Sequence, residues 1–248
     1  GFVRDTLMGE VSNDLDIVVN LPSGGIDLAN TLTELDNSHS DSNPIVYPKY
    51  GTASFHLKNN GECSDVVIES VETRKEQYHS DSRNPETCFG SLEEDAFRRD
   101  LTINALYYNI STDKVEDVTG KGLDDLKNHV IRTTNDNPNI VFFEDPLRIM
   151  RVIRFANRYG WNIEDKTWQS LQECASRIKI ISQERIRNEL NKIISNKDCI
   201  NGLYYLKDSG ILYHILPELF VQSFVPCSQN FNSMFDKIVT ICNQAPTC

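Results

Sequence analysis

The segment EDPLRIMRVIRF, residues 144–155, separates two halves of the chain that differ in their pattern of apolar residues. From Pro146 onward the apolar residues recur with the period of a helix, and at 100° per residue they occupy one side of a helix over 146–159. A proline in the first turn, after two acidic residues, is typical of a helix start. The opposite side carries a row of arginines, Arg148, Arg151, Arg154 and Arg158. A solvated helix face usually mixes Lys, Glu and Gln, so this row indicates a face that binds an anion.

The helical pattern continues after this segment, and a β-rich pattern precedes it. We expect helices over 166–178, 183–194 and 200–208, with Ser182 and Glu184 marking the start of the second. Short apolar runs predict strands over 15–19, 52–57, 66–71 and 105–110, and Asn59-Asn60-Gly61 predicts a hairpin turn. The polar stretches 36–43 and 79–95 are expected to be loops. The predicted class is therefore α+β, with a mixed-sheet head over 1–110, a helical neck over 111–195 and a further helical part over 196–248.

Composition excludes several kinds of protein. The 248 residues carry a net charge of −11, contain no apolar run of 18 residues, and begin without the charged-then-apolar pattern of a secretory leader. We therefore expect neither a membrane partner nor a non-specific coat on nucleic acid. The seven cysteines have no paired spacing of a zinc site, which favours free thiols. The charge is uneven, because residues 1–100 hold a net −11 and residues 144–192 a net +3.

Two carboxylates stand at the start of the first predicted strand. On a strand, Asp14 and Asp16 project from one face roughly 6–7 Å apart, while the alternate residues face a core. Such a pair can hold Mg²⁺, which keeps open positions for phosphate oxygens. Glu69, on a later strand, is a candidate third carboxylate. Considered alone, the pair is more typical of a solvated face near a turn, because such pairs are common.

Three further groups of residues match the needs of a nucleotide. Gly1 and Arg4, just before the carboxylates, suit phosphate oxygens. In RRDLTINAL, residues 98–106, Arg99 can meet a triphosphate, and Asp100 and Asn104 are i,i+4 neighbours on a helical turn that can share a ligand. In the arginine segment, Asp145 offers acceptors and Arg148 planar donors that together match the edge of a nucleobase.

In this order, these pieces resemble the class II tRNA nucleotidyltransferases, the family of CCA-adding enzymes and bacterial poly(A) polymerases, and are closest to its eukaryotic-type branch. The family pattern is GGxVRD with DxDI, then RRDxTxNAL, Dxx(G)xGxxDL, EDPxRxxRxxRF and SxERIxxExxKI. The matching segments are residues 1–5 with 14–17, 98–106, 117–126, 144–155 and 182–193. Five ordered motifs over about 190 residues are far more specific than any one of them.

The resemblance implies a polymerase-β-like nucleotidyltransferase head, a helical neck that selects the base, and the start of a helical body. It implies Mg²⁺-dependent addition of CMP, CMP and AMP, from CTP and ATP, to the 3′ end of tRNA without a template. Asp14 and Asp16 would hold the metal and act in catalysis, whereas the other residues would bind or support. The implied nucleotide-binding residues are Gly1, Arg4, Arg99, Asp100, Asn104, Asp145, Arg148, Arg151 and Arg154, and the supporting ones are Glu69, Glu184 and Arg185. The segment 79–95 matches the family's flexible loop, implicated in the switch from C to A addition.

The chain departs from the family pattern in three places. It shows one glycine of the first pair, so we expect the family's first strand to be lost or cut away, and Lys121 separates the glycines of the third motif. We expect the tRNA-gripping tail to be absent or truncated. Alternatives are a poly(A) polymerase, an enzyme adding only CC or only A, a non-catalytic RNA-binding relative, and an acidic structural domain. Two intact carboxylates argue against the non-catalytic relative. We expect a cytoplasmic protein, with nuclear or mitochondrial copies if the source is a eukaryote.

Overall fold

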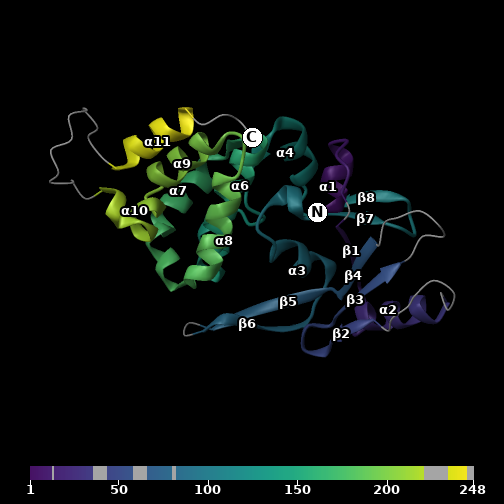
Figure 1. Ribbon diagram of the computed structural model, residues 1–248. Helices are drawn as coiled ribbons and strands as arrows, with labels where there is room; N and C mark the ends of the chain where they lie inside the picture. Colours follow the sequence, from purple (N-terminus) through teal and green to yellow (C-terminus); the bar gives the residue numbers. More distant parts are fainter. Residues whose placement is uncertain (13, 36–43, 58–65, 80–81, 221–233, 245–248) are drawn as a thin grey trace, which may run out of the picture. The chain divides into compact units, whose positions relative to one another are not determined.

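The computed structural model describes residues 1–12, 14–35, 44–57, 66–79, 82–220 and 234–244. The chain divides into two units, Gly1–Leu126 and Lys127–Cys248 (Figure 1). The expected boundary at residue 110 lies inside the first unit, and the one at 195 lies inside the second. Among the described residues, no helix is long and apolar enough to cross a membrane.

A mixed four-stranded sheet is the centre of the first unit, in the order β1-β4-β3-β2. Its strands are β1 (Leu15–Val19), β2 (Ile45–Tyr47), β3 (Thr52–Leu57) and β4 (Val66–Glu72). β1 runs parallel to β4, whereas β3 pairs antiparallel with both β4 and β2. Two antiparallel pairs complete the strands, β5 (Arg74–His79) with β6 (Ser82–Phe89) and β7 (Leu106–Asn109) with β8 (Lys114–Asp117). The predicted mixed-sheet head is therefore confirmed.

Helix α2 (Gly24–Leu35) covers one face of this sheet, as Figure 1 shows. Leu15 and Ile17 of β1 pack there against a buried cluster of Ala29, Ala53, Phe55 and Ile68, as their alternation predicts. Helix and sheet approach closely at Gly25, where a Cβ atom would lie 2.7 Å from the Cα of Val71. Ser70 Oγ donates to the Gly25 carbonyl at 2.6 Å, so the contact is both close and hydrogen-bonded.

The other face of β1 packs against a second cluster. Val18 contacts Ala96 of α3 (Leu92–Phe97) and Ala105 and Tyr107, which lie at β7. Helix α1 (Phe2–Leu7) precedes β1, the 3₁₀ turn η2 (Thr102–Asn104) precedes β7, and α4 (Gly122–Asn128) follows β8. The motif residues of the first half are thus arranged around β1 and β7.

The loop expected over 79–95 is wrong for most of its length. This segment contains β6 and the start of α3. β6 is polar and includes Pro85, so its sequence carries no strand pattern, and its pairing with β5 decides its structure. Ser91 caps α3 in a capping box, accepting from Glu94 N at 3.1 Å, and this signal was present in the sequence. The loop over 36–43 and the turn at 59–61 lie outside the described residues.

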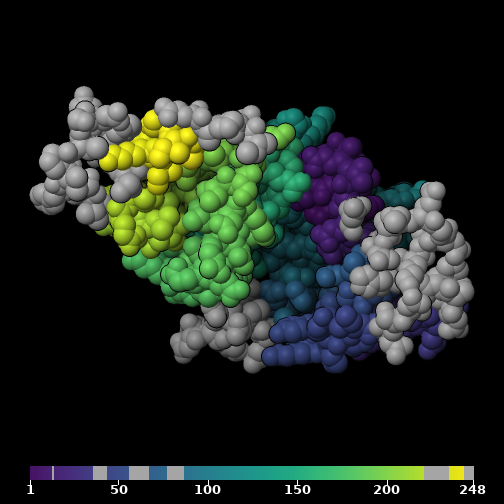
Figure 2. Space-filling model, viewed as in Figure 1, coloured from purple at the N-terminus to yellow at the C-terminus, as the bar shows by residue number. Residues whose placement is uncertain are grey.

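The second unit is mostly helical, as expected. Its helices are α5 (Pro138–Glu144), α6 (Leu147–Tyr159), α7 (Asp165–Cys174), α8 (Gln183–Ile194), α9 (Cys199–Asp208), α10 (Ile211–Ile215) and α11 (Met234–Gln244). α7 continues as the 3₁₀ turn η3 (Ala175–Ile180), and β9 (Val130–Ile131) and β10 (Asn162–Ile163) form a short parallel pair. α6 packs against α8 and α9, and α11 packs beside α9, where it is yellow in Figure 2. The apolar side of α6 is fully buried at Ile149, Val152 and Ile153.

Among the described cysteines, Cys88, Cys174, Cys199 and Cys242 carry free thiols; Cys88 is exposed and the other three are partly exposed.

Candidate functional site

The two front carboxylates lie where the sequence places them. Asp14 immediately precedes β1 and Asp16 is on it, and both side chains are exposed while Leu15 and Ile17 turn to the core. Partial desolvation, and then the nearby Asp14 carboxylate, raises the pKa of Asp16, and the Arg99 charge opposes the shift. Carboxylates that repel each other in this way gain from a cation between them.

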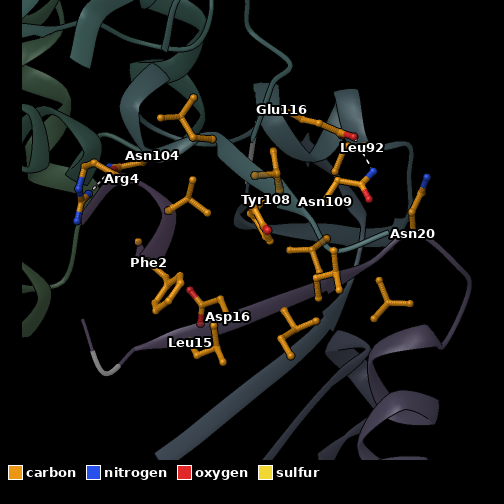
Figure 3. Close-up of a pocket in the computed structure, with 18 of the residues that line it drawn as sticks. Phe2, Arg4, Leu15, Asp16, Asn20, Leu92, Asn104, Tyr108, Asn109 and Glu116 are labelled. Atoms are coloured by element: carbon orange, nitrogen blue, oxygen red, sulfur yellow. Dashed lines mark hydrogen bonds between the residues drawn. The ribbon is translucent and has the colours of Figure 1, made fainter. Parts of the chain in front are cut away.

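Asp16 lines a pocket of about 620 Å³ within the first unit. Its walls come from the chain start, from β1, and from the residues around η2 and β7. Figure 3 shows Asp16 on β1 at one wall and Arg4 and Asn104 together at another. Five residues predicted from the sequence line this pocket, Gly1, Arg4, Asp16, Arg99 and Asn104. Asp14, Glu69 and Asp100 are not among its lining residues.

Arg4 is held by a chain of polar contacts that begins at its own helix. Its guanidinium pairs with Asp5 at 2.6 Å and donates to Asn104 Oδ1 (Figure 3). Asn104 Nδ2 donates in turn to Asp100 Oδ1 at 3.0 Å, which also accepts from the Leu101 amide at 2.9 Å. The chain orients Arg4 and Asn104, although they are 100 residues apart.

Asp100 has a different place from the one expected. We predicted that Asp100 and Asn104 share a ligand from a helical turn, but Asp100 precedes a 3₁₀ turn that ends at Asn104, and the two side chains bond to each other. Asp100 is 6% exposed and its side chain serves the turn. Thr102 Oγ1 donates to the buried Asp125 at 2.7 Å, so the third motif fixes the same turn from its other side.

Arg99 reaches the pocket from the end of α3. Its Nη2 donates to Asp95 at 3.1 Å, its Nη1 donates to the Asn104 carbonyl at 3.2 Å, and the guanidinium lies 5.0 Å from the Tyr107 ring centre. Sequence reasoning missed Asp95 and Tyr107. The spacing of Asp95 and Arg99, four residues apart at the end of α3 and just beyond it, is the signal that could have pointed to their pairing.

The donor set suits Mg²⁺ bound with a phosphate substrate. Asp14 and Asp16 supply two hard oxygen donors on an open side, which leaves positions for water and substrate. Glu69 lies in register with Asp16 on β4 and is exposed. Among the described residues, however, no three His, Cys, Asp or Glu side chains group closely enough to hold a metal ion, so Glu69 completes no cage here.

In the second unit, two arginines of the α6 row, Arg148 and Arg154, pair with acidic side chains. Arg148 is 7% exposed and its Nη1 donates to Glu144 at 2.7 Å and to the Val141 carbonyl at 3.3 Å. Arg154 pairs with the buried Glu189 of α8 at 2.7 Å. Arg151 lies 5.7 Å from the ring centre of Phe155, on the same helix.

Helix α8 supports the start of α6. Arg185 Nη2 donates to Asp145 Oδ2 at 2.8 Å, and the Leu147 amide donates to Asp145 Oδ1 at 3.0 Å. Glu184, which was expected to share this role, is exposed in the first turn of α8. Asp145 and Arg148 are thus each held by a partner of their own.

Comparison with known proteins finds family matches in both units. A family described as the poly A polymerase head domain matches residues 1–132, and one described as the probable RNA and SrmB-binding site of polymerase A matches 160–222. The chain is 40% identical over 213 residues to a mitochondrial CCA tRNA nucleotidyltransferase of Candida glabrata, covering 82% of this chain and 40% of the relative. It is 38% identical to a tRNA nucleotidyltransferase of Schizosaccharomyces pombe, covering 83% of this chain and 44% of the relative. The chain thus spans less than half the length of either relative.

A solved structure shows the same likeness. It is a tRNA nucleotidyltransferase complexed with a primer tRNA and an incoming ATP analog, superposes with a TM-score of 0.71 at 30% identity, and covers 88% of this chain and 58% of the other.

Proposed function

The chain belongs to the class II family of tRNA nucleotidyltransferases and poly(A) polymerases, and on that premise we propose that it adds CMP, CMP and AMP to the 3′ end of tRNA. The substrates are then CTP, ATP and a tRNA that lacks its last three nucleotides. The metal that the family's chemistry implies is a divalent ion, and we propose Mg²⁺ from the oxygen donors of Asp14 and Asp16.

One observation carries this proposal. Arg4, Asp16, Arg99 and Asn104 come from distant parts of the sequence and line one pocket. Cationic donors opposite a carboxylate are what a triphosphate bound with a metal ion requires, because Asp14 and Asp16 would hold the metal and Arg4 and Arg99 would compensate the remaining phosphate charge.

In the proposed reaction, the 3′-hydroxyl of the tRNA attacks the α-phosphorus of the nucleotide and pyrophosphate leaves. The chemistry supplied by bound Mg²⁺ is a lower pKa of that hydroxyl and charge neutralisation at the pyrophosphate. Gly1, Arg4 and Arg99 bind the triphosphate, and Asn104, oriented by Asp100, contacts the ribose. Glu69 supports the carboxylates from the neighbouring strand.

The second unit is proposed to select the base. Asp145 would offer acceptors and Arg148 donors to the edge of cytosine or adenine, and Arg151 and Arg154 are proposed as phosphate-binding residues. The contacts of Arg185 with Asp145 and of Glu144 with Arg148 support this proposal, because they hold both side chains in one orientation.

The alternative is a poly(A) polymerase of the same fold. It remains a candidate because the family that matches the head is described as the poly A polymerase head domain. An enzyme adding only CC or only A is a further variant of the same chemistry. Cytoplasmic, nuclear or mitochondrial location stays a prediction, and the relative from Candida glabrata is named as mitochondrial.

The test is incubation of the full chain with Mg²⁺ and tRNA lacking CCA, with CTP and ATP offered separately and together. Addition of two C residues from CTP alone, and of one A only after them, supports CCA addition. An unlimited A tail identifies the poly(A) polymerase. No incorporation under any condition rejects the enzyme proposals.

A further inference from the structure

The carboxylate of Asp95 is fully buried and joins two adjacent arginines, Arg98 and Arg99. Its two oxygen atoms have different partners. Burial raises the pKa of such a group, but the charges of Arg98 and Arg99 outweigh burial and hold the pKa of Asp95 below its ordinary value. Asp95 is therefore an ion at neutral pH, at the centre of a buried network.

The Oδ1 atom of Asp95 bonds to residues outside the pocket. It accepts from Arg98 Nη2 at 2.6 Å and from the Arg74 amide at 3.3 Å. Arg98 also donates to Glu76 at 3.3 Å and to the Arg74 carbonyl at 3.2 Å. The contacts of the Oδ1 atom therefore connect the end of α3 to β5. Arg98 is not among the residues that line the pocket.

The Oδ2 atom of Asp95 bonds to two residues that line the pocket. It accepts from Tyr107 Oη at 2.7 Å and from Arg99 Nη2 at 3.1 Å and Nε at 3.3 Å. Arg99 and Tyr107 both line the pocket with Asp16. A planar guanidinium held at two of its nitrogens by one carboxylate and placed over a ring has little freedom to turn.

We propose that Asp95 is a positioning residue, which acts through its Oδ2 atom and Tyr107 to orient Arg99 toward the phosphates of the incoming nucleotide. The inference rests on the proposed function and adds to it a residue outside the pocket. Arg98 and Arg99 form a matched pair, since they are adjacent, carry the same charge and share one carboxylate, but only Arg99 reaches the pocket. Comparing variants at these positions therefore distinguishes an effect on the orientation of Arg99 from a general effect on the fold.

The first test compares single variants in the CCA-addition assay. Asp95→Asn keeps the shape but removes the charge, and we expect the KM for CTP and ATP to rise roughly tenfold to a hundredfold with a smaller change in kcat. Arg98→Gln should change KM by less than about twofold, because its contacts lead away from the pocket. Equal rises in the two variants, or an unchanged KM in folded Asp95→Asn, overturn the proposal.

The second test is a double-mutant cycle with Arg99→Ala. If Asp95 acts through Arg99, then Asp95→Asn has little further effect on nucleotide KM once Arg99 is absent, whereas independent roles multiply. Full multiplication of the two effects contradicts the proposal. If Asp95→Asn fails to fold by circular dichroism, Tyr107→Phe replaces it, because it removes one hydrogen bond and no charge. We expect it to raise KM about twofold to fivefold, and only in the presence of Arg99. An unchanged KM in Tyr107→Phe contradicts the role of the Oδ2 side.

Binding of MgCTP and MgATP, measured by calorimetry on the same variants, distinguishes the two levels of inference. If the wild type extends no tRNA but binds nucleotide, and the cycle in Kd is non-additive, the proposed function fails and the role of Asp95 stands. If the wild type extends tRNA and the cycle is additive, the role of Asp95 fails and the function stands. If the wild type neither extends tRNA nor binds nucleotide, both fail.

Discussion

The two units of the molecule hold their arginines in different ways. In the second unit, Arg148 pairs with Glu144, four residues before it at the end of α5, and Arg154 pairs with Glu189 on the adjacent helix α8. In the first unit, Arg4 donates to Asn104, 100 residues away, and the residues around it come from a helix, a strand and a 3₁₀ turn. A site built on helices follows the 3.6-residue period and can be read locally, whereas a site built between strands and turns depends on the sheet that brings them together.

The largest effect is expected at Asp16, in the unit where the metal is proposed to bind. Asp16→Asn should lower nucleotide incorporation by about a thousandfold or more, because one of two metal-holding carboxylates is lost. Single-nucleotide extension of tRNA measures the loss, and circular dichroism checks the fold. The matched control is Asp27→Asn on the exposed side of α2, which should leave activity unchanged. Normal incorporation by Asp16→Asn would contradict the proposed role of Asp16 in metal binding and catalysis.

The next effect is on stability and belongs to the second unit. Glu189→Gln leaves Arg154 without its charged partner in a nearly buried place, and we expect the free energy of unfolding to fall by about 3 kcal/mol. Urea denaturation measures it. Glu173→Gln, an exposed change on α7, should alter that free energy by less than about 0.5 kcal/mol. Equal losses would mean that the Arg154 pair is no more than a surface contact.

Arg148 tests whether the second unit selects the base. Arg148→Ala should reduce the preference for the correct nucleotide by about tenfold to a hundredfold, because a planar donor pair at the base edge is lost. The measurement is the ratio of kcat/KM for CTP and ATP on tRNAs ending before C and before A. Arg158→Ala, exposed on the same helix and outside the proposed base-edge pair, serves as the control, because it should leave the choice between CTP and ATP unchanged. A variant that keeps strict selection contradicts the proposed role.

The smallest effect is a pH dependence in the first unit. The pKa of Asp95 is lower in the folded protein than the ordinary value, so its contribution to stability is present above the unfolded pKa of about 3.9 and is lost as pH falls through the folded pKa. The difference in urea midpoint between wild type and Asp95→Asn should therefore shrink on acidification from pH 6 to below pH 4. A constant difference over this range would show that Asp95 acts without its charge.

The same contrast decides how much was predictable. The bounds of β1, β3 and α8 follow from alternation and helical period, and the cap of α8 from Ser182. The segment 79–95 was wrong because β6 is polar on both sides, and its strand exists only through hydrogen bonds to β5. Asp100 was placed on a helical turn with Asn104, because sequence spacing does not distinguish an α-turn from a 3₁₀ turn between two packed elements.

By itself, the sequence determined the division into a strand-rich head and a helical part, the family, and the residue types of the site, since these depend on local pattern and on five ordered motifs. Only the tertiary structure decided which of those side chains meet. It placed Asp16, Arg4, Arg99 and Asn104 in one pocket, moved Asp100 to the support of a turn, and put Asp95 beneath Arg99. The physical reason is that a buried carboxylate is stable only with its charge compensated, and the packing of α3 against β5 and β7 determines which arginines are near enough to compensate it.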